Sequence, residues 1–404
     1  MGTDKLFFIN NEMKITYGDL INGINSRKEY NNYFRTNSLY EFVLNLLVAI
    51  VNNNSIKLIN PYKPISIIED DNSAILNCRG SNKIKVIDVA HLIYLVKTSQ
   101  SEITFFTSGS TGKPKPVIQT IQKLLRSTII SEKHKEDIWG FAYNPAHIAG
   151  IQVFFQALCN HNTMIYLYNL KKRNEIINLM STMEVTHISA TPTFYRLLLP
   201  ADFDLPRVQR ITLGGEMSGL AIFDFLKKAF PNARFRNIYA TTETGSILSS
   251  DGDIFYLDSS NQKYIKIQNN ALLINEALIQ DNKDCETWYN TGDVVEILGI
   301  NPLSFKFVGR NNDIVNVGGE NVNLREVEEV ILQYPNVTNA RIVPKKNNLI
   351  GNVLIAEIIF DNEAPFNEYD VITFMNRRLP YFKVPRIVKS VKEFQTTYSG
   401  KLIR

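Results

Sequence analysis

Short apolar runs alternate with longer segments of helical periodicity over residues 1–250 of the chain. Residues 38–51 predict an amphipathic helix with Ser38 or Asn37 as its N-cap, ended by the polar run 52–55. A second helix is predicted at residues 174–183. Strands are predicted at residues 56–59, 103–106, 164–167, 187–190 and 208–213. Because strands and helices alternate, the pattern indicates an α/β fold whose sheet is covered by helices.

The pattern changes after residue 250, where short β segments are separated by turns. Residues 254–256, 264–267 and 272–274 predict a small β subdomain. The polar run 309–313 predicts a linker, and residues 314–404 predict a compact α+β domain of strand, helix, strands, helix and strand. The expected organisation is a large N-terminal domain over residues 1–309, a linker at 310–313 and a small C-terminal domain over residues 314–404.

Amino-acid composition excludes only a few classes of function and location. The 404 residues are 44% apolar and 21% charged, with a net charge of +4, so nothing indicates a nucleic-acid partner. The three cysteines, Cys78, Cys159 and Cys285, are widely spaced, and we expect reduced core residues of a cytoplasmic protein. The N-terminus lacks the apolar core of a signal peptide, and the longest apolar stretch, residues 42–51, is too short to span a membrane.

The strongest candidate chemistry lies in a run of hydroxyl, glycine and lysine residues at 107–115, directly after a predicted strand. Glycines allow a tight turn whose N–H groups bind an anion, hydroxyls add donors and lysines add charge. This suits a phosphate chain such as that of ATP; a solvated flexible loop is the alternative. The run is not a Walker loop, because Thr107 and Pro114 stand where that loop needs Gly and Ser or Thr.

Four later motifs each have an ordinary structural alternative. The segment Gly214-Gly215-Glu216 follows a predicted strand and could be a helix-entry turn. Glu243 could bind Mg²⁺ beside hydroxyl groups, or could start a helix. Asp293, at the end of a β segment, could bind a ribose diol or form an Asx turn. Lys401, taken alone, would be a solvated charge.

Taken in order, these motifs resemble those of the adenylate-forming superfamily: acyl-CoA synthetases, carrier-loading adenylation domains and luciferases. The matching segments are 107–115, 239–243, 291–293, 309–328 and 400–401. The resemblance implies an enzyme that uses ATP and Mg²⁺ to convert a carboxylic acid into an acyl-adenylate, releases pyrophosphate and transfers the acyl group to a thiol. The variant Gly318-Gly319-Glu320-Asn321 most resembles acyl-CoA ligases for aryl and other small acids, so CoA is the expected acceptor.

The resemblance also implies roles for individual residues. The β- and γ-phosphates would be held by Thr107, Ser108, Gly109, Ser110, Thr111, Gly112 and Lys115. The AMP and metal site would comprise Gly214, Gly215, Glu216, Tyr239, Ala240, Thr241, Thr242 and Glu243, with Glu243 as the Mg²⁺ ligand. Ala240 replaces the usual Gly, and its methyl group should narrow the acyl pocket slightly or alter the backbone there. Asp293 would bind the ribose, and Arg310 would lie at the domain junction.

The remaining implied roles concern the acyl pocket and the small domain. His147 would help close the carboxylate end of the pocket, while Gly150 and Gly215 would leave room for a flat ring or chain. The small domain would rotate about Asn312, which stands where the family has Asp or Lys. Lys401 would act in adenylate formation. After the rotation, Gly318 and Gly319 would let a pantetheine arm pass close to the backbone.

Several alternatives stay open. The thiol could belong to the phosphopantetheine of an acyl or peptidyl carrier protein instead of CoA. A non-catalytic nucleotide-binding module is a different class, against which the retention of Glu243 and Lys401 argues. The acid is not identified, and both a monomer and a homodimer are compatible with the sequence. The part before residue 103 is shorter than is typical of the family, which predicts that some outer helices, or part of a dimer surface, are missing.

Overall fold

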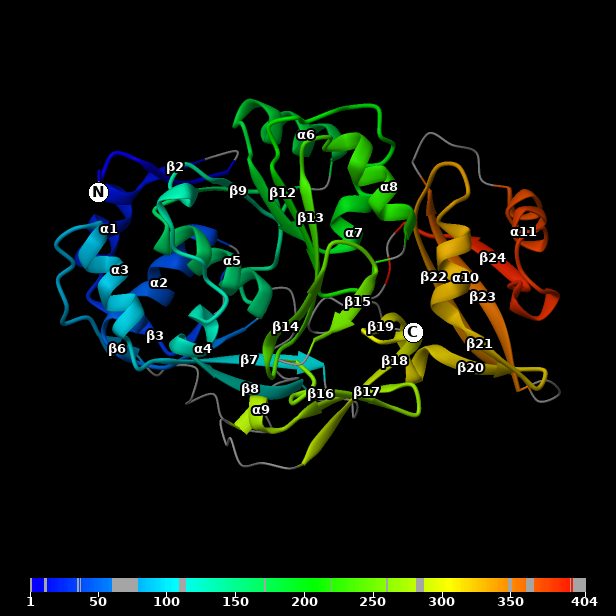
Figure 1. Cartoon of the computed structure of the whole chain (residues 1–404). Coiled ribbons are helices and arrows are strands. Elements are labelled where there is room, and N and C mark those ends of the chain that lie inside the picture. Colours follow the sequence, from blue (N-terminus) through cyan, green and yellow to red (C-terminus); the bar gives the residue numbers. More distant parts are fainter. Residues whose placement is uncertain are drawn as a thin grey trace.

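A computed structural model describes most of the chain, with a large N-terminal domain and a smaller C-terminal domain (Figure 1). The described residues are 2–10, 13–34, 36, 38–59, 79–108, 114–170, 172–218, 220–258, 261–280, 287–347, 351–360, 367–392 and 394. The predicted fold class, an α/β protein with a small α+β domain at the C-terminal side, is confirmed.

An eight-stranded sheet forms the centre of the large domain. In spatial order its strands are β14 (Gly245–Ser250), β13 (Arg234–Thr241), β12 (Arg210–Gly214), β11 (His187–Ala190), β9 (Ile138–Phe141), β10 (Thr163–Tyr166), β1 (Leu6–Ile9) and β2 (Lys14–Thr16). The inner strands are parallel, and the two edge strands β14 and β2 are antiparallel to their neighbours. The strands predicted near residues 164–167, 187–190 and 208–213 are therefore confirmed.

Helices cover both faces of this sheet. One apolar core contains residues of α1 (Tyr17–Ser26), α2 (Leu39–Val51), α3 (Val89–Thr98), α4 (Ile121–Leu125) and α5 (Ile148–Cys159). The other contains residues of α6 (Arg173–Thr182), α7 (Pro192–Arg196) and α8 (Leu220–Ala229). Along β10, Met164 and Tyr166 face the first core while Ile165 faces the second. A parallel strand buried on both faces is continuously apolar for this reason.

Helix α2 corrects one expectation. Ser38 is its N-cap and it ends at Val51, as predicted, but eleven of its thirteen residues are buried. It is a core helix and not an amphipathic one. The buried polar side chain of Asn45 has hydrogen-bond partners, because it accepts from the N–H (2.8 Å) and donates to the carbonyl (2.9 Å) of Asn31.

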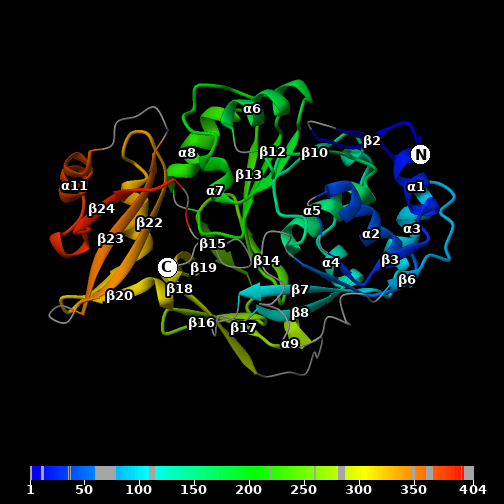
Figure 2. The same ribbon diagram turned by 180° about the vertical axis from the view of Figure 1, so that it is seen from behind.

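Two smaller sheets flank the central one (Figure 2). The first has the order β4 (Tyr33–Phe34), β5 (Ile56–Leu58), β7 (Glu102–Ser108) and β8 (Pro114–Thr120), and a separate pair joins β3 (Glu29–Asn31) to β6 (Arg79–Ser81). The second is the predicted β subdomain, with the order β15 (Ile254–Leu257), β19 (Leu303–Arg310), β18 (Trp288–Ile300), β17 (Ala271–Asn275) and β16 (Ile265–Gln268), followed by the short helix α9 (Ala277–Gln280) after β17. Asp293 lies inside the long strand β18, so the expectation that it ends a β segment is wrong.

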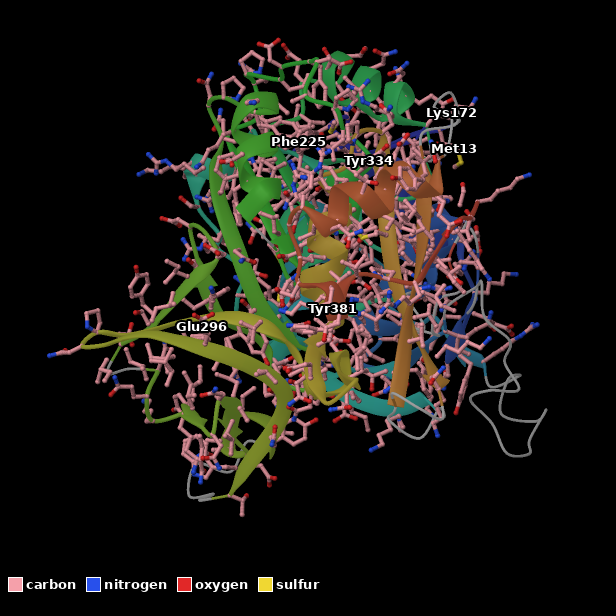
Figure 3. The ribbon with its side chains drawn as sticks, turned by 90° about the vertical axis from the view of Figure 1, so that its right-hand side faces the viewer. Met13, Lys172, Phe225, Glu296, Tyr334 and Tyr381 are labelled. Carbon is pink, nitrogen blue, oxygen red and sulfur yellow. The ribbon has the colours of Figure 1, made fainter. Side chains whose placement is uncertain are left out.

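The small domain has its own apolar core. It contains η4 (Asn311–Asp313), β20 (Ile314–Val317), β21 (Glu320–Asn323), α10 (Leu324–Ile331), β22 (Val337–Asn347), β23 (Gly351–Phe360), α11 (Glu368–Asn376), η5 (Tyr381–Lys383) and β24 (Ile387–Ser390). Seen from its side, Tyr334 lies within this domain and Glu296 lies on the β18 ribbon, which extends away from it (Figure 3). In the described part of the chain, no helix is both long and apolar enough to cross a membrane.

Candidate active site

The predicted site residues of the large domain gather where the parallel strands end. Gly214 is the last residue of β12, Tyr239 and Thr241 close β13, and the turn at residues 191–193 follows β11. The Tyr143 hydroxyl, just after β9, donates to the carbonyl of Gly214 at 3.4 Å. Ligands of open α/β sheets bind outside these carboxyl ends.

Asp293 is the centre of a polar cluster that joins this edge to the β subdomain. The Tyr239 hydroxyl donates to Asp293 Oδ2 at 2.7 Å, and Arg310 Nε donates to Asp293 Oδ1 at 2.8 Å. The Tyr239 ring stacks on Phe307 of β19, with centroids 4.5 Å apart. Asp293 and Arg310 are also register partners in β18 and β19. Three elements from different parts of the chain thus position one carboxylate.

The charge state of this cluster follows from burial and from its ion pair. Burial, and then the negative charge of Asp293, raise the pKa of the Tyr239 phenol, so it stays neutral and donates. Burial lowers the pKa of Arg310, but the charge and hydrogen bond of Asp293, together with the charges of Tyr239 and Asp313, raise it by more, so the net pKa is raised. Among the described residues each oxygen of Asp293 has one donor, and since a carboxylate oxygen has two lone pairs, each can accept a further hydroxyl. This capacity fits the predicted ribose diol.

Gln119 of β8 is a site residue that the sequence did not reveal. Its buried side-chain amide donates to the carbonyls of Thr242 (2.8 Å) and Glu243 (2.9 Å). β8 pairs with β7 from Glu102↔Thr120 to Ser108↔Pro114, so both strands flank the hydroxyl/glycine/lysine loop. Gln119 therefore connects that hairpin to the turn carrying the predicted metal ligand.

Glu243 lies in a tight turn between β13 and β14, so the helix-start alternative is wrong. The Thr244 N–H donates to Thr241 Oγ1 at 3.2 Å, and the two threonine hydroxyls are 2.9 Å apart. Burial, and then the negative charge of Glu243, raise the pKa of the half-exposed Tyr289 phenol. A carboxylate presented among hydroxyls is a donor set that suits Mg²⁺.

The turn at residues 214–216 has a clear local role. Glu216 Oε2 accepts from the Thr193 hydroxyl (2.6 Å) and from its N–H (3.2 Å), at the start of α7. Gly215 adopts φ +82°, a conformation that favours glycine. Glu216 therefore holds the start of α7 against the end of β12.

Gly150 corrects a second expectation. A Cβ at this position would lie 2.3 Å from the carbonyl oxygen of Asn144, so glycine is needed for close packing inside the protein and does not make room for an acid. His147 is the N-cap residue of α5, and its backbone N–H donates to that same carbonyl at 3.0 Å. His147 is therefore placed by the same turn.

Some predicted residues lie outside the described part of the chain or away from this cluster. Gly109, Ser110, Thr111, Gly112 and Lys401 are not among the described residues, and only the backbone is described for Ser108. Thr107 is the last but one residue of β7 and pairs with the exposed Lys115 of β8, whose carbonyl lies 3.4 Å from the Thr107 hydroxyl. Gly318 and Gly319 form an exposed turn, where a Cβ added to either residue would meet no atom within 4 Å.

Comparison with known proteins places this geometry in a family. The sequence model of the AMP-binding enzyme family matches residues 96–283, and that of the AMP-binding enzyme C-terminal domain matches residues 326–401. The chain belongs to the AMP-binding enzymes. The two matches fall on the large and small domains in order and together cover more than half of the chain, which confirms the predicted superfamily.

Named relatives of this AMP-binding enzyme include two CoA ligases and a synthase. The 2-succinylbenzoate–CoA ligase of Listeria monocytogenes is 25% identical over 76% of this chain and 69% of its own. The 2-succinylbenzoate–CoA ligase of Bacillus licheniformis is 26% identical over 81% of this chain and 76% of its own length. One of the proteins that make up plipastatin synthase in Bacillus subtilis is 22% identical over 85% of this chain but only 16% of its own length.

Solved structures share the fold of this AMP-binding enzyme. The o-succinylbenzoate CoA synthetase of Bacillus subtilis, in complex with its acyl-adenylate intermediate, superposes with a TM-score of 0.70 at 18% identity, covering 99% and 94% of the two chains. The structure of the same protein with ATP and a magnesium ion superposes with a TM-score of 0.69. ATP-bound MatB from Rhodopseudomonas palustris gives 0.66 at 16% identity, covering 99% and 94%.

Proposed function

We propose that this AMP-binding enzyme is an ATP-dependent acid–thiol ligase. It converts a carboxylic acid, aryl or of small to medium size, into an acyl-adenylate with release of pyrophosphate. It then transfers the acyl group to the thiol of CoA. The observation that carries the proposal is Asp293, a carboxylate beside the turn that carries Glu243, each of whose oxygens takes a single donor from the described residues.

The residues at the carboxyl edge fit ATP and Mg²⁺. Asp293 would accept the two ribose hydroxyls, while Arg310 and Tyr239 keep its carboxylate oriented. Glu243 would be the Mg²⁺ ligand, in the turn fixed by Gln119. When bound, Mg²⁺ supplies positive charge against the phosphate oxygens.

In adenylate formation the carboxylate of the acid attacks the α-phosphate of ATP, and these two anions repel each other. Positively charged and hydrogen-bonding groups of the chain would reduce this repulsion. The run 107–115, which contains Lys115, would hold the departing pyrophosphate through N–H groups, hydroxyls and charge. Lys401 would neutralise the attacking carboxylate and the transition state. His147, fixed by the turn at Asn144, would close the carboxylate end of the acyl pocket.

The second half-reaction needs the small domain to move. The exposed Gly318–Gly319 turn lies on the β20–β21 hairpin, and that hairpin packs on β23 of its own domain, with Asn352 Nδ2 donating to the Asn316 carbonyl at 2.8 Å. A rotation about residues 310–313, with Asn312 as the hinge, would bring this turn to the large domain. Domain boundaries at 309 and 314 are part of this proposal.

A carrier protein is the second candidate acceptor, supported by the relationship to plipastatin synthase. Both acceptors present the same phosphopantetheine thiol, so the acyl-adenylate chemistry is common to them. We place the enzyme in the cytoplasm, where Cys159, buried and unpaired, would stay reduced.

The test is a pyrophosphate-release screen over aryl, fatty and amino acids, each with ATP and Mg²⁺, run without acceptor, with CoA and with a phosphopantetheinylated carrier. The ligase predicts acid-dependent pyrophosphate and a CoA thioester for an aryl or small acid. A thioester on the carrier alone would select the second candidate. Absence of acid-dependent pyrophosphate throughout the screen would leave a nucleotide-binding module.

A further inference from the structure

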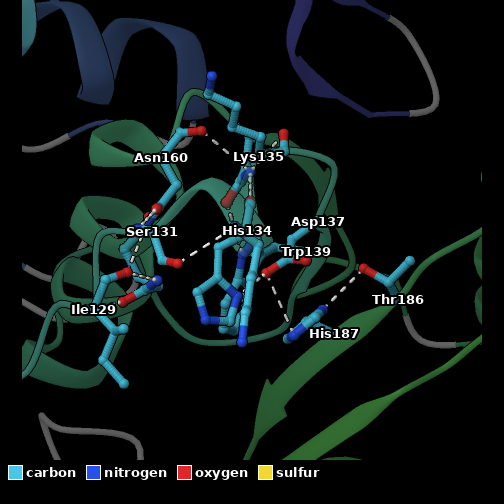
Figure 4. Close-up of polar contacts among 12 residues, drawn as sticks. Ile129, Ser131, His134, Lys135, Asp137, Trp139, Asn160, Thr186 and His187 are labelled. Carbon is cyan, nitrogen blue, oxygen red and sulfur yellow. Dashed lines mark hydrogen bonds and ion pairs between the residues drawn. The ribbon is translucent and has the colours of Figure 1, made fainter.

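Three metal-ligating side chains converge at the edge of the central sheet opposite to the nucleotide site (Figure 4). His134 belongs to the short helix η3 (Glu132–His134), Asp137 directly precedes β9, and His187 is the first residue of β11. They lie at the amino ends of these parallel strands, roughly 13 Å along four-residue strands from the carboxyl edge. The cluster is therefore separate from the proposed active site.

The donor set is chemically specific. His134 Nδ1 lies 2.8 Å from Asp137 Oδ2, and His187 Nε2 lies 3.4 Å from the same oxygen. The three ligand atoms lie within 4.8 Å of one another. Two imidazoles and one carboxylate suit Zn²⁺ and similar first-row ions, whereas Mg²⁺ and Ca²⁺ prefer oxygen ligands alone.

The spacing is close to that of a tetrahedral site. Ligand atoms about 2.0–2.1 Å from Zn²⁺ lie about 3.3 Å apart, which the His187–Asp137 distance of 3.4 Å matches. The His134 ring would have to move by about 0.5 Å to reach the same spacing. His134 is the most exposed of the three, at 20% against 9% for Asp137 and 6% for His187, so it has room to move and leaves a side open to water.

The hydroxyl of Thr186 fixes the position of the His187 ring. It accepts from the Ile138 N–H (2.8 Å), and its single proton has two acceptors in reach, the Ile138 carbonyl (3.3 Å) and His187 Nδ1 (2.9 Å). In the tautomer in which the hydroxyl donates to the carbonyl, Nδ1 carries the ring proton and Nε2 presents a lone pair to the carboxylate of Asp137. Binding of a cation would select this tautomer. Two acceptors that face each other are stabilised by a cation between them, and a hydrogen-bonded second shell of this kind orients a metal-binding His.

The rest of the surroundings is largely fixed. Asn162 Nδ2 donates to the carbonyl of His134, and Asn162 Oδ1 accepts from the Trp139 indole at 3.2 Å. The Trp139 and His187 rings lie 4.9 Å apart. The charge of Arg210, the register partner of His187 in β12, opposes a cation, and the carboxylate of Asp137 offsets it.

We propose that His134, Asp137 and His187 bind one Zn²⁺ or similar first-row divalent ion, with water as the remaining ligand. The site has no part in the acyl transfer. Its ion would fix the segment before β9 to the start of β11, so that two neighbouring strands of the central sheet are held at their amino ends.

The test uses the full-length protein after dialysis against a chelator. Titration with Zn²⁺ is followed by calorimetry, and titration with Co²⁺ by visible absorption, which reports coordination geometry directly. Because Trp139 lies beside His187, bound Co²⁺ should also quench its fluorescence, and this quenching should disappear in Trp139→Phe but persist in Trp288→Phe. The site predicts one ion per chain, micromolar or tighter binding and a higher unfolding temperature with Zn²⁺.

Matched variants separate this site from others on the chain. His134→Gln removes the most exposed ligand and should weaken Zn²⁺ binding at least tenfold, whereas His91→Gln, on α3, should not change it. Should His134→Gln fail to fold, the isosteric Asp137→Asn replaces it. Equal Zn²⁺ affinity in the variant and the parent, or no Co²⁺ absorption in the parent, would overturn the proposal and leave a hydrogen-bonded cluster only.

Discussion

Asp293 is the residue on which the polar contacts of the nucleotide site converge. In the described part of the chain its two oxygens each take one donor, from Tyr239 and from Arg310, and a carboxylate oxygen can accept a second. Glu296, three residues further along β18, provides a comparison with Asp293. It also forms an ion pair across β18 and β19, with Lys306 at 2.9 Å, but this pair is exposed to solvent.

Replacing Asp293 with Asn should raise KM for ATP about 10- to 100-fold in a pyrophosphate-release assay, equivalent to about 1.4–2.8 kcal/mol. The amide keeps the size of the side chain but loses its charge and one acceptor, and it leaves Arg310 without its ion-pair partner. Glu296→Gln is the matched control and should leave KM unchanged, since an exposed pair contributes about 0–1 kcal/mol. An unchanged KM in Asp293→Asn would contradict the ribose assignment.

At the scale of elements, the site depends on contacts between strands far apart in the sequence. Gln119 of β8 reaches Thr242 and Glu243 across a separation of 123 and 124 residues. A motif search cannot find such a residue, because the pairing of β7 with β8 and not a local pattern gives it its role. The resemblance to a family predicted Asp293 and Glu243, but not the Gln119 amide that holds the turn of Glu243.

The variant Gln119→Met keeps the length of the side chain but removes both donors. Two half-buried carbonyls lose their partner, so the free energy of unfolding should fall by about 1–2 kcal/mol. The kcat for adenylate formation should fall about tenfold, as expected from a positioning residue displaced from its turn. Gln122→Met, which also removes an amide–carbonyl bond but on α4, should leave kcat unchanged. Equal kcat values in the two variants would exclude the positioning role.

Gly150 makes a second prediction at this scale. An Ala Cβ would overlap the Asn144 carbonyl at 2.3 Å, so Gly150→Ala should lower the free energy of unfolding by about 1–3 kcal/mol. Gly252→Ala meets no atom within 4 Å and should change it by less than about 0.5 kcal/mol. Chemical denaturation of both variants checks this prediction. If the Gly150→Ala protein were as stable as the parent, the packing role would be contradicted and the role of Gly150 in the acyl pocket would stand.

At the scale of the whole molecule, the sequence predicted the order of the domains and most elements, since alternation of strands and helices is a local signal. It could not predict that α2 is buried on nearly all sides, because this depends on its neighbours α1 and α3. It also missed the His134–Asp137–His187 cluster, because residues 50 positions apart meet only through the register of β9 and β11. Long-range pairing is the common cause of these misses.

The two half-reactions should separate in a variant of the small domain. Lys401→Ala should reduce acyl-adenylate formation at least a hundredfold, because loss of a group that stabilises transition-state charge costs about 2.7–4 kcal/mol. It should leave thioester formation from supplied acyl-adenylate within about twofold, below 0.5 kcal/mol. Lys389→Ala, an exposed lysine on β24, is the control for charge and should affect neither step. Equal loss of both steps would contradict the role of Lys401.

The most direct measurement is a single-turnover reaction of the purified protein with ATP, Mg²⁺ and a responsive acid, analysed by mass spectrometry before and after addition of CoA. The account predicts acyl-adenylate and pyrophosphate before CoA is added, and AMP with the acyl-CoA thioester afterwards. Formation of ADP and an acyl phosphate, or of a thioester without a preceding acyl-adenylate, would contradict it.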